Sequence, residues 1–260
     1  MRKVILYAVI LIGFGLVAVA AYFLIPVLRS QTPVAAVMGR GHCSIAADIP
    51  SLTWPADYGT DMRKRVDSEI QKAVAALLDK HEPAGTPPHA TISEAQNALL
   101  KWCKDDYTSI EPYNVDVNIK ITQNAGGILS MQIIDSFKTY GHLPAERSAG
   151  LVIDTATAKV LSLADLVAPG QMAAFAAIEH KELLAVGAPY LYQNVKDEIA
   201  GFLLRPTEAA AEDWYAHHGY ATVTPDAVVV SYDAGDIISR PPEGILSVVI
   251  PRSKLNGILK

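Results

Sequence analysis

The side chains that could perform hydrolysis or hold a metal ion are present, but their spacing matches no catalytic motif. A serine hydrolase would place its nucleophile in a Gly-x-Ser-x-Gly elbow, and the sequence contains none. The seven histidines show no His-Glu-x-x-His or comparable spacing. The neighbours His217 and His218 would point to different faces of a helix or strand. We therefore expect no metal ligands, no cofactor and no catalytic activity.

Paired acids would offer another route to hydrolysis, because glycoside hydrolases work with two carboxylates. Asp105 with Asp106 and Asp233 with Asp236 are closely spaced pairs of this kind. In loops, such pairs more often form turns and solvated caps. Asp165, in the segment LSLADL, is expected to cap the helix that follows it. A cell-wall hydrolase or a deacetylase-associated enzyme is the alternative interpretation.

The two cysteines, Cys43 and Cys103, predict a disulfide rather than a reactive thiol. The sequence has no Cys-x-x-Cys motif that would favour redox chemistry. Outside the plasma membrane, two thiols usually form one disulfide. Closing a loop of this length would stabilise the fold by about 4 kcal/mol in the chain-entropy model.

An uncharged apolar run occupies residues 4–28 and predicts a membrane anchor. Its 25 residues would form a helix about 37 Å long, which exceeds a hydrocarbon core of about 30 Å. Arg2 and Lys3 precede the run, and basic residues stay on the cytoplasmic side. We therefore expect a single-pass protein of the plasma (inner) membrane, with residues 1–28 as cytoplasmic tip and transmembrane helix and the C-terminal part outside.

A cleaved signal peptide is the alternative for this run. The segment from Ala18 to Ala20 is a passable small-x-small cleavage site. Cleavage there would leave an apolar new terminus, and the run is longer than a typical signal core, so we favour the anchor. Both interpretations place the remaining chain outside the cell membrane.

The charge of the outer part argues against a nucleic-acid partner. The whole chain carries a formal charge of −5. Because Arg2 and Lys3 supply +2 and residues 1–28 contain no acid, the remainder carries −7. An acidic surface of this kind is compatible with a basic protein partner.

The hydrophobic periodicity predicts an α+β fold, with an antiparallel sheet packed on helices. Apolar residues three and four apart predict amphipathic helices, and strict alternation predicts half-buried strands. The expected helices are 61–80, 91–104 (opened by a Thr91–Glu94 capping box), 166–186 and 191–217, and the expected strands are 113–123, 128–137, 149–154, 220–224, 228–232 and 245–250. Residues 29–46 predict a tether with little pattern, and 47–260 one extracytoplasmic domain.

An aromatic cluster at a helix-to-strand corner has two equally supported interpretations. Its members are Trp214, Tyr215, His217, His218 and Tyr220. The first interpretation is a contact patch, because exposed aromatic side chains anchor interfaces. The second is the edge of a core, with polar tips in water.

The order of the segments resembles a known extracellular domain family. The matching pieces are IPSL (49–52), YGH (140–142), GLVIDTATAKVLSLADLV (150–167), TVTPDAVVVSYDAG (222–235) and LSVVIPRSKLNGIL (246–259). They resemble the extracellular domain shared by the lysozyme-sensing anti-sigma factor RsiV and the N-terminal module of the peptidoglycan deacetylase PdaC. The resemblance spans residues 47–260.

This resemblance implies a binding module for a protein or cell-wall ligand, with a lysozyme-like muramidase as first candidate. A purely structural envelope subunit is a further alternative. The contact surface is expected at the loops 140–144 and 233–244, which follow strand ends. The second loop is longer than in the family and lacks its second tyrosine, and we expect no sigma-binding segment before residue 4. The expected binding residues are Tyr140, His142, Tyr232, Asp233, Asp236 and Arg240.

Overall fold

A computed structural model of the chain describes residues 31–38, 43–50, 52, 54, 59–82, 85–105, 113–138, 145–233, 237–238 and 245–260. Among the residues so described, no helix combines the length and the apolar character needed to cross a membrane. The apolar run at 4–28 lies outside these residues, so the anchor stays a prediction.

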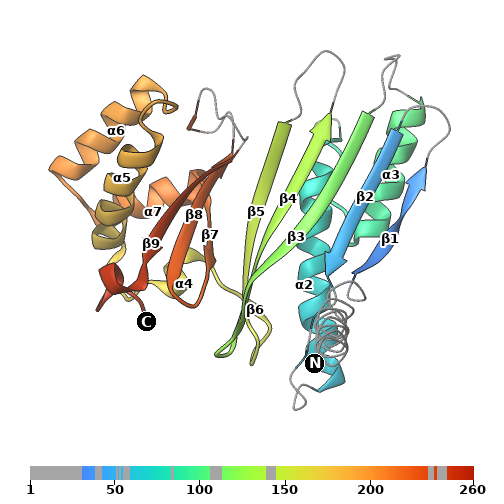
Figure 1. Ribbon diagram of the computed structural model, residues 1–260, viewed down its shortest axis with the longest axis horizontal. Helices are drawn as coiled ribbons and strands as arrows, with labels where there is room; N and C mark the ends of the chain where they lie inside the picture. The colour runs from blue at the N-terminus through green and yellow to red at the C-terminus, as the bar shows by residue number, and fades with distance from the viewer. Residues whose placement is uncertain are drawn as a thin grey trace, which may run out of the picture.

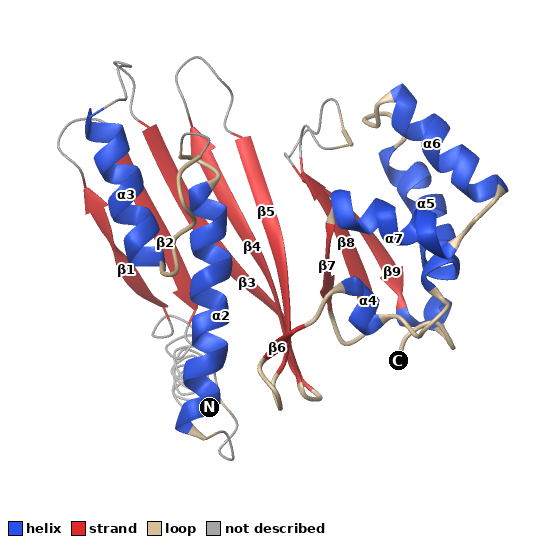
Figure 2. Cartoon of the chain, turned by 180° about the vertical axis from the view of Figure 1, so that it is seen from behind, coloured by secondary structure: helices blue, strands red, loops and turns tan. Residues whose placement is uncertain are grey.

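A six-stranded sheet with two helices on one face forms the first region (Figure 1). The strands lie in sequence order, and the helices cross the face that Figure 2 turns toward the viewer. The elements are β1 (Gln31–Met38), β2 (Cys43–Pro50), α2 (Thr60–Asp79), α3 (Ile92–Asp105), β3 (Tyr113–Ala125), β4 (Ile128–Lys138), β5 (Ala145–Asp154) and β6 (Lys159–Val160).

The first sheet is mixed, so the prediction of an antiparallel sheet is wrong at one position. Strands β3 to β6 pair antiparallel as expected, but β2 pairs parallel to β3. The expected tether is also corrected, because residues 31–38 and 43–50 are strands. Ile45 and Ala47 of β2 are buried, a two-residue alternation too short to stand out in the sequence.

The helices of this region follow the predicted pattern. Val66, Ile70 and Val74 lie on one stripe of α2 and are buried against the sheet. The capping box of α3 is confirmed: the Glu94 carboxylate accepts from the Ala90 and Thr91 backbone N–H groups, each at 3.1 Å. The Thr91 hydroxyl accepts in turn from the Glu94 backbone N–H at 3.3 Å.

The predicted disulfide between Cys43 and Cys103 is confirmed. It joins the first residue of β2 to the last turn of α3, and the two Cα atoms are 6.4 Å apart. The bond therefore fastens β2 to a helix that packs on the same sheet.

The predicted hairpin of β3 and β4 is also confirmed. Val115, Val117 and Ile133 point into the core that α2 and α3 cover. The two-residue turn uses Gly126 and Gly127 at φ of 65° and 77°. Both angles are in the left-handed region that glycine adopts readily, as this tight turn requires.

A three-stranded antiparallel sheet packed on helices forms the second region. A short helix at LSLADL begins it, and there Asp165 accepts from the Ser162 backbone N–H at 2.9 Å. Asp165 thus caps the helix that contains it, not a later one. The elements are α4 (Leu163–Leu166), α5 (Met172–Gly187), α6 (Gln193–Leu204), α7 (Glu208–His217), β7 (Tyr220–Val223), β8 (Ala227–Asp233), β9 (Ile245–Pro251) and the 3₁₀ helix η1 (Arg252–Leu255).

Strand β5 belongs to both hydrophobic cores. Leu151 and Ile153 pack into the first core, under α2 and α3, whereas Val152 packs into the second. Successive residues of a strand face opposite sides. The second sheet therefore packs on the face of the first sheet that α2 and α3 leave uncovered, and Figures 1 and 2 both show β5 nearest to β7.

Candidate functional site

A pocket of about 380 Å³ lies at the junction of the two sheets. We call it the junction pocket. Its walls come from the end of α2, from β5 and from the segment between α7 and β8. The lining residues are Lys80, Ser148, Ala149, Gly150, His217, Gly219, Tyr220 and Asp233.

One carboxylate joins the two sheets in this pocket. Asp233 is the last residue of β8, and its Oδ1 accepts from the Ser148 backbone N–H at 2.9 Å and from the Ser148 hydroxyl at 2.6 Å. Both partners lie near strand ends, because β5 begins at Ala145. A carboxylate that accepts two hydrogen bonds is held in a fixed orientation. The Ser148 hydroxyl donates its proton in this contact.

A glycine lets β5 and β7 approach closely behind the pocket. A Cβ at Gly150 would lie 2.5 Å from the Ala221 carbonyl oxygen and 2.5 Å from the Tyr220 ring, so no larger residue fits without a shift of the backbone. The Tyr220 hydroxyl accepts from the Gln132 side-chain amide at 3.0 Å. Burial raises the pKa of Tyr220, which keeps the hydroxyl protonated at neutral pH.

The rim of the pocket carries exposed polar side chains. Lys80 is exposed, and its backbone carbonyl accepts from the Arg147 guanidinium at 3.1 Å. His217 is exposed at the end of α7, where its Nδ1 bonds the Asp213 carbonyl at 2.8 Å. A cation, an imidazole and a fixed carboxylate around one hollow suit a polar ligand, such as a peptide or a sugar.

The predicted binding residues have different outcomes. Asp233 lines the junction pocket. Tyr232 is fully buried, with its hydroxyl donating to Glu179 Oε1 at 3.0 Å, so its ring packs in the second core instead of facing a ligand. The other four predicted binding residues lie outside the described residues, and their role stays a prediction: Tyr140, His142, Asp236 and Arg240.

The aromatic cluster divides between core and pocket. Trp214 is 4% exposed, so its ring packs in a core, but its indole N–H donates to the buried Tyr232 hydroxyl at 3.2 Å and does not face water as the core-edge interpretation expected. Tyr215 is half-buried and donates to Glu179 at 3.3 Å. His217 and Tyr220 instead line the junction pocket.

Sequence reasoning missed Ser148, Gly150 and Lys80 as pocket residues. Strand alternation was a usable signal for the first two, because both lie on the face of β5 opposite the apolar Leu151. Nothing in the sequence indicated that a second sheet would pack on this face.

This architecture defines a class of protein: a two-part α+β domain in which a helix-covered mixed sheet carries a smaller antiparallel sheet on its other face. No protein-family model matches the sequence, and no curated protein matches it significantly.

Two solved structures share the fold over most of the chain. A DUF3298 family protein from Pseudomonas aeruginosa PAO1 is 20% identical, with coverage of 89% of this chain and 91% of that chain and a TM-score of 0.55. A DUF3298 family member from Bacteroides fragilis is 15% identical, with coverage of 88% and 91% and a TM-score of 0.52. These likenesses establish the fold and are consistent with the RsiV and PdaC resemblance.

Proposed function

We propose that the chain is a non-catalytic binding module of the bacterial cell envelope, which holds a protein or cell-wall ligand at the junction pocket. The observation that carries this proposal is the contact between Ser148 and Asp233. It holds the beginning of β5 against the end of β8. The predicted contact loops, 140–144 and 233–244, are joined in the chain to these two strand ends, which supports a ligand site at the pocket.

A basic muramidase such as lysozyme is the first partner to test. The resemblance to the lysozyme-sensing domain favours it. The formal charge of −7 on residues 4–260 would also speed its encounter with a basic enzyme. Such an encounter weakens as salt screens the charges.

We place the module on the outer side of the plasma membrane. The disulfide supports this placement, because stable disulfides form mainly in oxidising compartments. The uncharged run at 4–28 and the basic residues before it support a single-pass anchor.

The test is a binding measurement on the full-length chain in detergent, by biolayer interferometry against lysozyme and against soluble peptidoglycan fragments. We expect saturable binding of lysozyme at low salt that weakens as salt is added. Replacing Tyr140, His142 and Arg240 together by alanine should weaken binding at least about tenfold, the effect of losing one good contact.

The matched control carries three alanines at exposed positions on α6 and just after it, Gln193, Asn194 and Arg205, which do not line the junction pocket. It should bind like the unchanged chain. Absence of lysozyme binding at low salt would refute the muramidase partner. Equal weakening in both triple variants would refute the loop assignment. Turnover of peptidoglycan fragments that disappears in Asp233→Asn would replace the binding module with an enzyme.

A further inference from the structure

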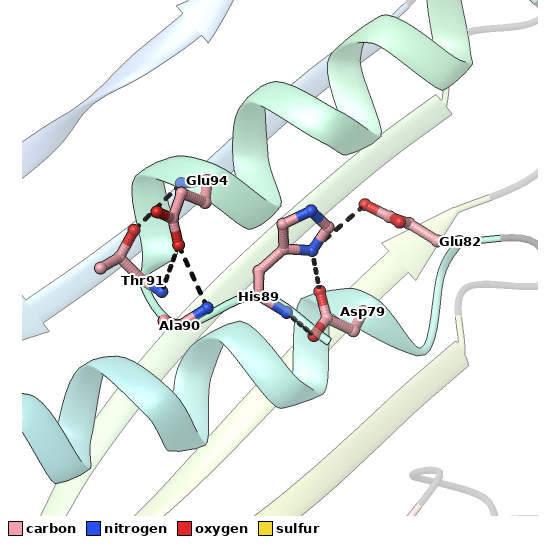
Figure 3. Close-up of polar contacts among 6 residues, drawn as sticks. All are labelled: Asp79, Glu82, His89, Ala90, Thr91 and Glu94. Atoms are coloured by element: carbon pink, nitrogen blue, oxygen red, sulfur yellow. Dashed lines mark hydrogen bonds and ion pairs between the residues drawn. The ribbon is translucent and has the colours of Figure 1, made fainter. Parts of the chain in front are cut away.

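Three side chains with metal-ligating atoms meet at the connection between α2 and α3. Asp79 is the last residue of α2, Glu82 follows it, and His89 lies shortly before α3. Figure 3 shows the two carboxylates turned toward the His89 ring. One ligating atom from each residue lies within 4.8 Å of the other two. The spacing of three and seven residues matches no common motif, which is why the sequence predicted no metal site.

The contacts in this cluster are uneven. His89 Nδ1 is 2.7 Å from Asp79 Oδ1 but 3.8 Å from Glu82 Oε1. The second oxygen of Asp79 accepts from the His89 backbone N–H at 2.9 Å. This backbone contact fixes the Asp79 carboxylate independently of the His89 ring.

Glu82 is the member whose surroundings need explaining. Its side chain is only 4% exposed, and within the described part of the chain its Oε1 is buried without a hydrogen-bond partner. Burying a carboxylate oxygen without a partner is unfavourable. Burial raises the pKa of Glu82, against the lowering effects of His89 and of a hydrogen bond from Thr86 to the carboxylate, and the neighbouring Asp79 adds to the rise.

A proton on His89 does not resolve this. The hydrogen bond to Asp79 raises the pKa of His89, so a protonated ring is one way to place positive charge here. Nδ1 carries a single proton, however, and the 2.7 Å contact directs it at Asp79. Glu82 Oε1 stays at 3.8 Å without a donor. A cation that binds several ligands at once would serve all three atoms.

We propose that Asp79, Glu82 and His89 bind one divalent transition-metal ion, and that the ion is Zn²⁺. Imidazole nitrogen and carboxylate oxygen are both ligand atoms that zinc takes, and a water molecule can supply the fourth position. Tetrahedral ligands at about 2.0–2.2 Å from zinc lie about 3.3 Å from one another. The 2.7 Å and 3.8 Å separations each differ from that value by about half an ångström. The ligand atoms of Asp79 and Glu82 lie within 4.8 Å of each other, so side-chain movements would complete the site.

The surroundings already hold two of the ligands in place. The His89 backbone N–H orients Asp79, as outer hydrogen bonds commonly orient metal ligands. Glu94 is engaged in capping α3 through the Ala90 and Thr91 N–H groups, which fixes the backbone that follows His89. A bound ion would tie the end of α2 to the start of α3, and its effect would be structural.

The test is zinc titration of the full-length chain in detergent after removal of metals with a chelator. Isothermal titration calorimetry should show one Zn²⁺ per chain. Thermal unfolding at a zinc concentration 100 times Kd should move Tm up by about 5–10 °C, if the described domain unfolds cooperatively. Mg²⁺ and Ca²⁺ at the same concentrations should not displace the zinc.

Two variants locate the site. Glu82→Gln keeps the shape of the side chain but removes its charge, and His89→Asn removes the ring nitrogen. Each should weaken zinc binding at least about tenfold, as expected for loss of a metal ligand. Circular dichroism should show that both variants still fold. If His89→Asn does not fold, the zinc affinity of Glu82→Gln alone tests the site.

Glu69→Gln and Glu182→Gln are the matched controls, because Glu69 lies in the middle of α2 and Glu182 lies on α5 in the second region. Both should bind zinc like the unchanged chain. Zinc binding that Glu82→Gln leaves unaltered would overturn the proposal, and so would loss of binding in Glu182→Gln alone. Failure to bind Zn²⁺ at millimolar concentration, or displacement of zinc by Mg²⁺, would overturn it too.

Discussion

Each region of the molecule buries one histidine against one carboxylate, and the two pairs are satisfied in opposite ways. In the first region, His81 is bonded at both ring nitrogens, to Asp135 and to the Tyr113 hydroxyl at 2.6 Å. In the second, Glu179 is bonded at both oxygens, to the hydroxyls of Tyr232 and Tyr215 and to His180. Within these two pairs, the buried atoms that find no partner among the described residues are Asp135 Oδ1 and His180 Nε2.

The difference shows which group organises each core. His81, just past the end of α2, joins Tyr113 of β3 to Asp135 of β4, so it ties the helix end to the sheet. Glu179 of α5 gathers hydroxyls from α7 and β8, so it ties helices to the smaller sheet. Buried polar networks of this kind stabilise the fold only while every member keeps its partners. Each region should therefore respond to its own set of substitutions.

The largest effect should come from the disulfide, and it should be confined to the first region. Replacing Cys43 and Cys103 by alanine releases a loop whose ends are 60 residues apart. It should lower the free energy of unfolding by about 4 kcal/mol. Hydrogen exchange should accelerate in β2 and α3 and stay slow in α5 and β8. Equal acceleration in both regions would show that the two cores unfold as a single unit.

The next effect should distinguish the two carboxylates. Glu179→Gln disturbs three hydrogen bonds to one side chain and should lower the free energy of unfolding by about 3 kcal/mol. Asp135→Asn disturbs one described bond and should lower it by about 2 kcal/mol. Chemical denaturation of the two variants measures both values.

The order of these two values tests the comparison. A larger loss for Asp135→Asn would mean that the first network, not the second, depends on its carboxylate. Tyr232→Phe provides a control within the second network, because it removes one of the three contacts of Glu179. Its loss in the free energy of unfolding should be smaller than that of Glu179→Gln but greater than zero.

The smallest effect should appear at the connection between the regions, where Asp165 of α4 bonds Lys159 of β6 and the N-cap residue Ser162. The Lys159 ammonium and then the Ser162 groups hold the pKa of Asp165 well below its usual value. A lowered pKa stabilises the fold at pH above the unfolded value, and this contribution is lost as the pH falls below about 4. Asp165→Asn should therefore flatten the fall of stability with pH, as followed by denaturation at pH 7 and pH 3. An unchanged profile would mean that the exposed bonds add nothing.

Local patterns predicted the helices and the hairpin, because their signals lie within one segment. The spacing of Val66, Ile70 and Val74 and the alternation of Val115 and Val117 required no knowledge of the rest of the chain. The disulfide could be predicted from the presence of two cysteines and the expected location outside the plasma membrane.

The relations between distant segments could not be predicted. The parallel strand β2 has only a short apolar alternation, and the junction pocket depends on β7 and β8 packing on β5. Asp79, Glu82 and His89 come together because α2 ends and the chain turns back. Their separations in the sequence match no known metal-binding motif, so the sequence alone did not indicate the site. Tyr232 was predicted to bind a ligand because it lies in a segment that resembles the family's loop motif. Its side chain is instead buried in the second core.

The parallel pairing of β2 also affects the order in which the protein can fold. In this parallel pairing Cys43 lies opposite Tyr113, 70 residues later, and both α2 and α3 lie between β2 and β3 in the sequence. Contacts over such separations require loop closure before they stabilise anything, and they slow folding. A chain that leaves the ribosome from its N-terminus would present β2 and its neighbour β1 long before β3 exists. The helices and the β3–β4 hairpin, whose contacts are local, should form first, and β2 should join a sheet that is already there.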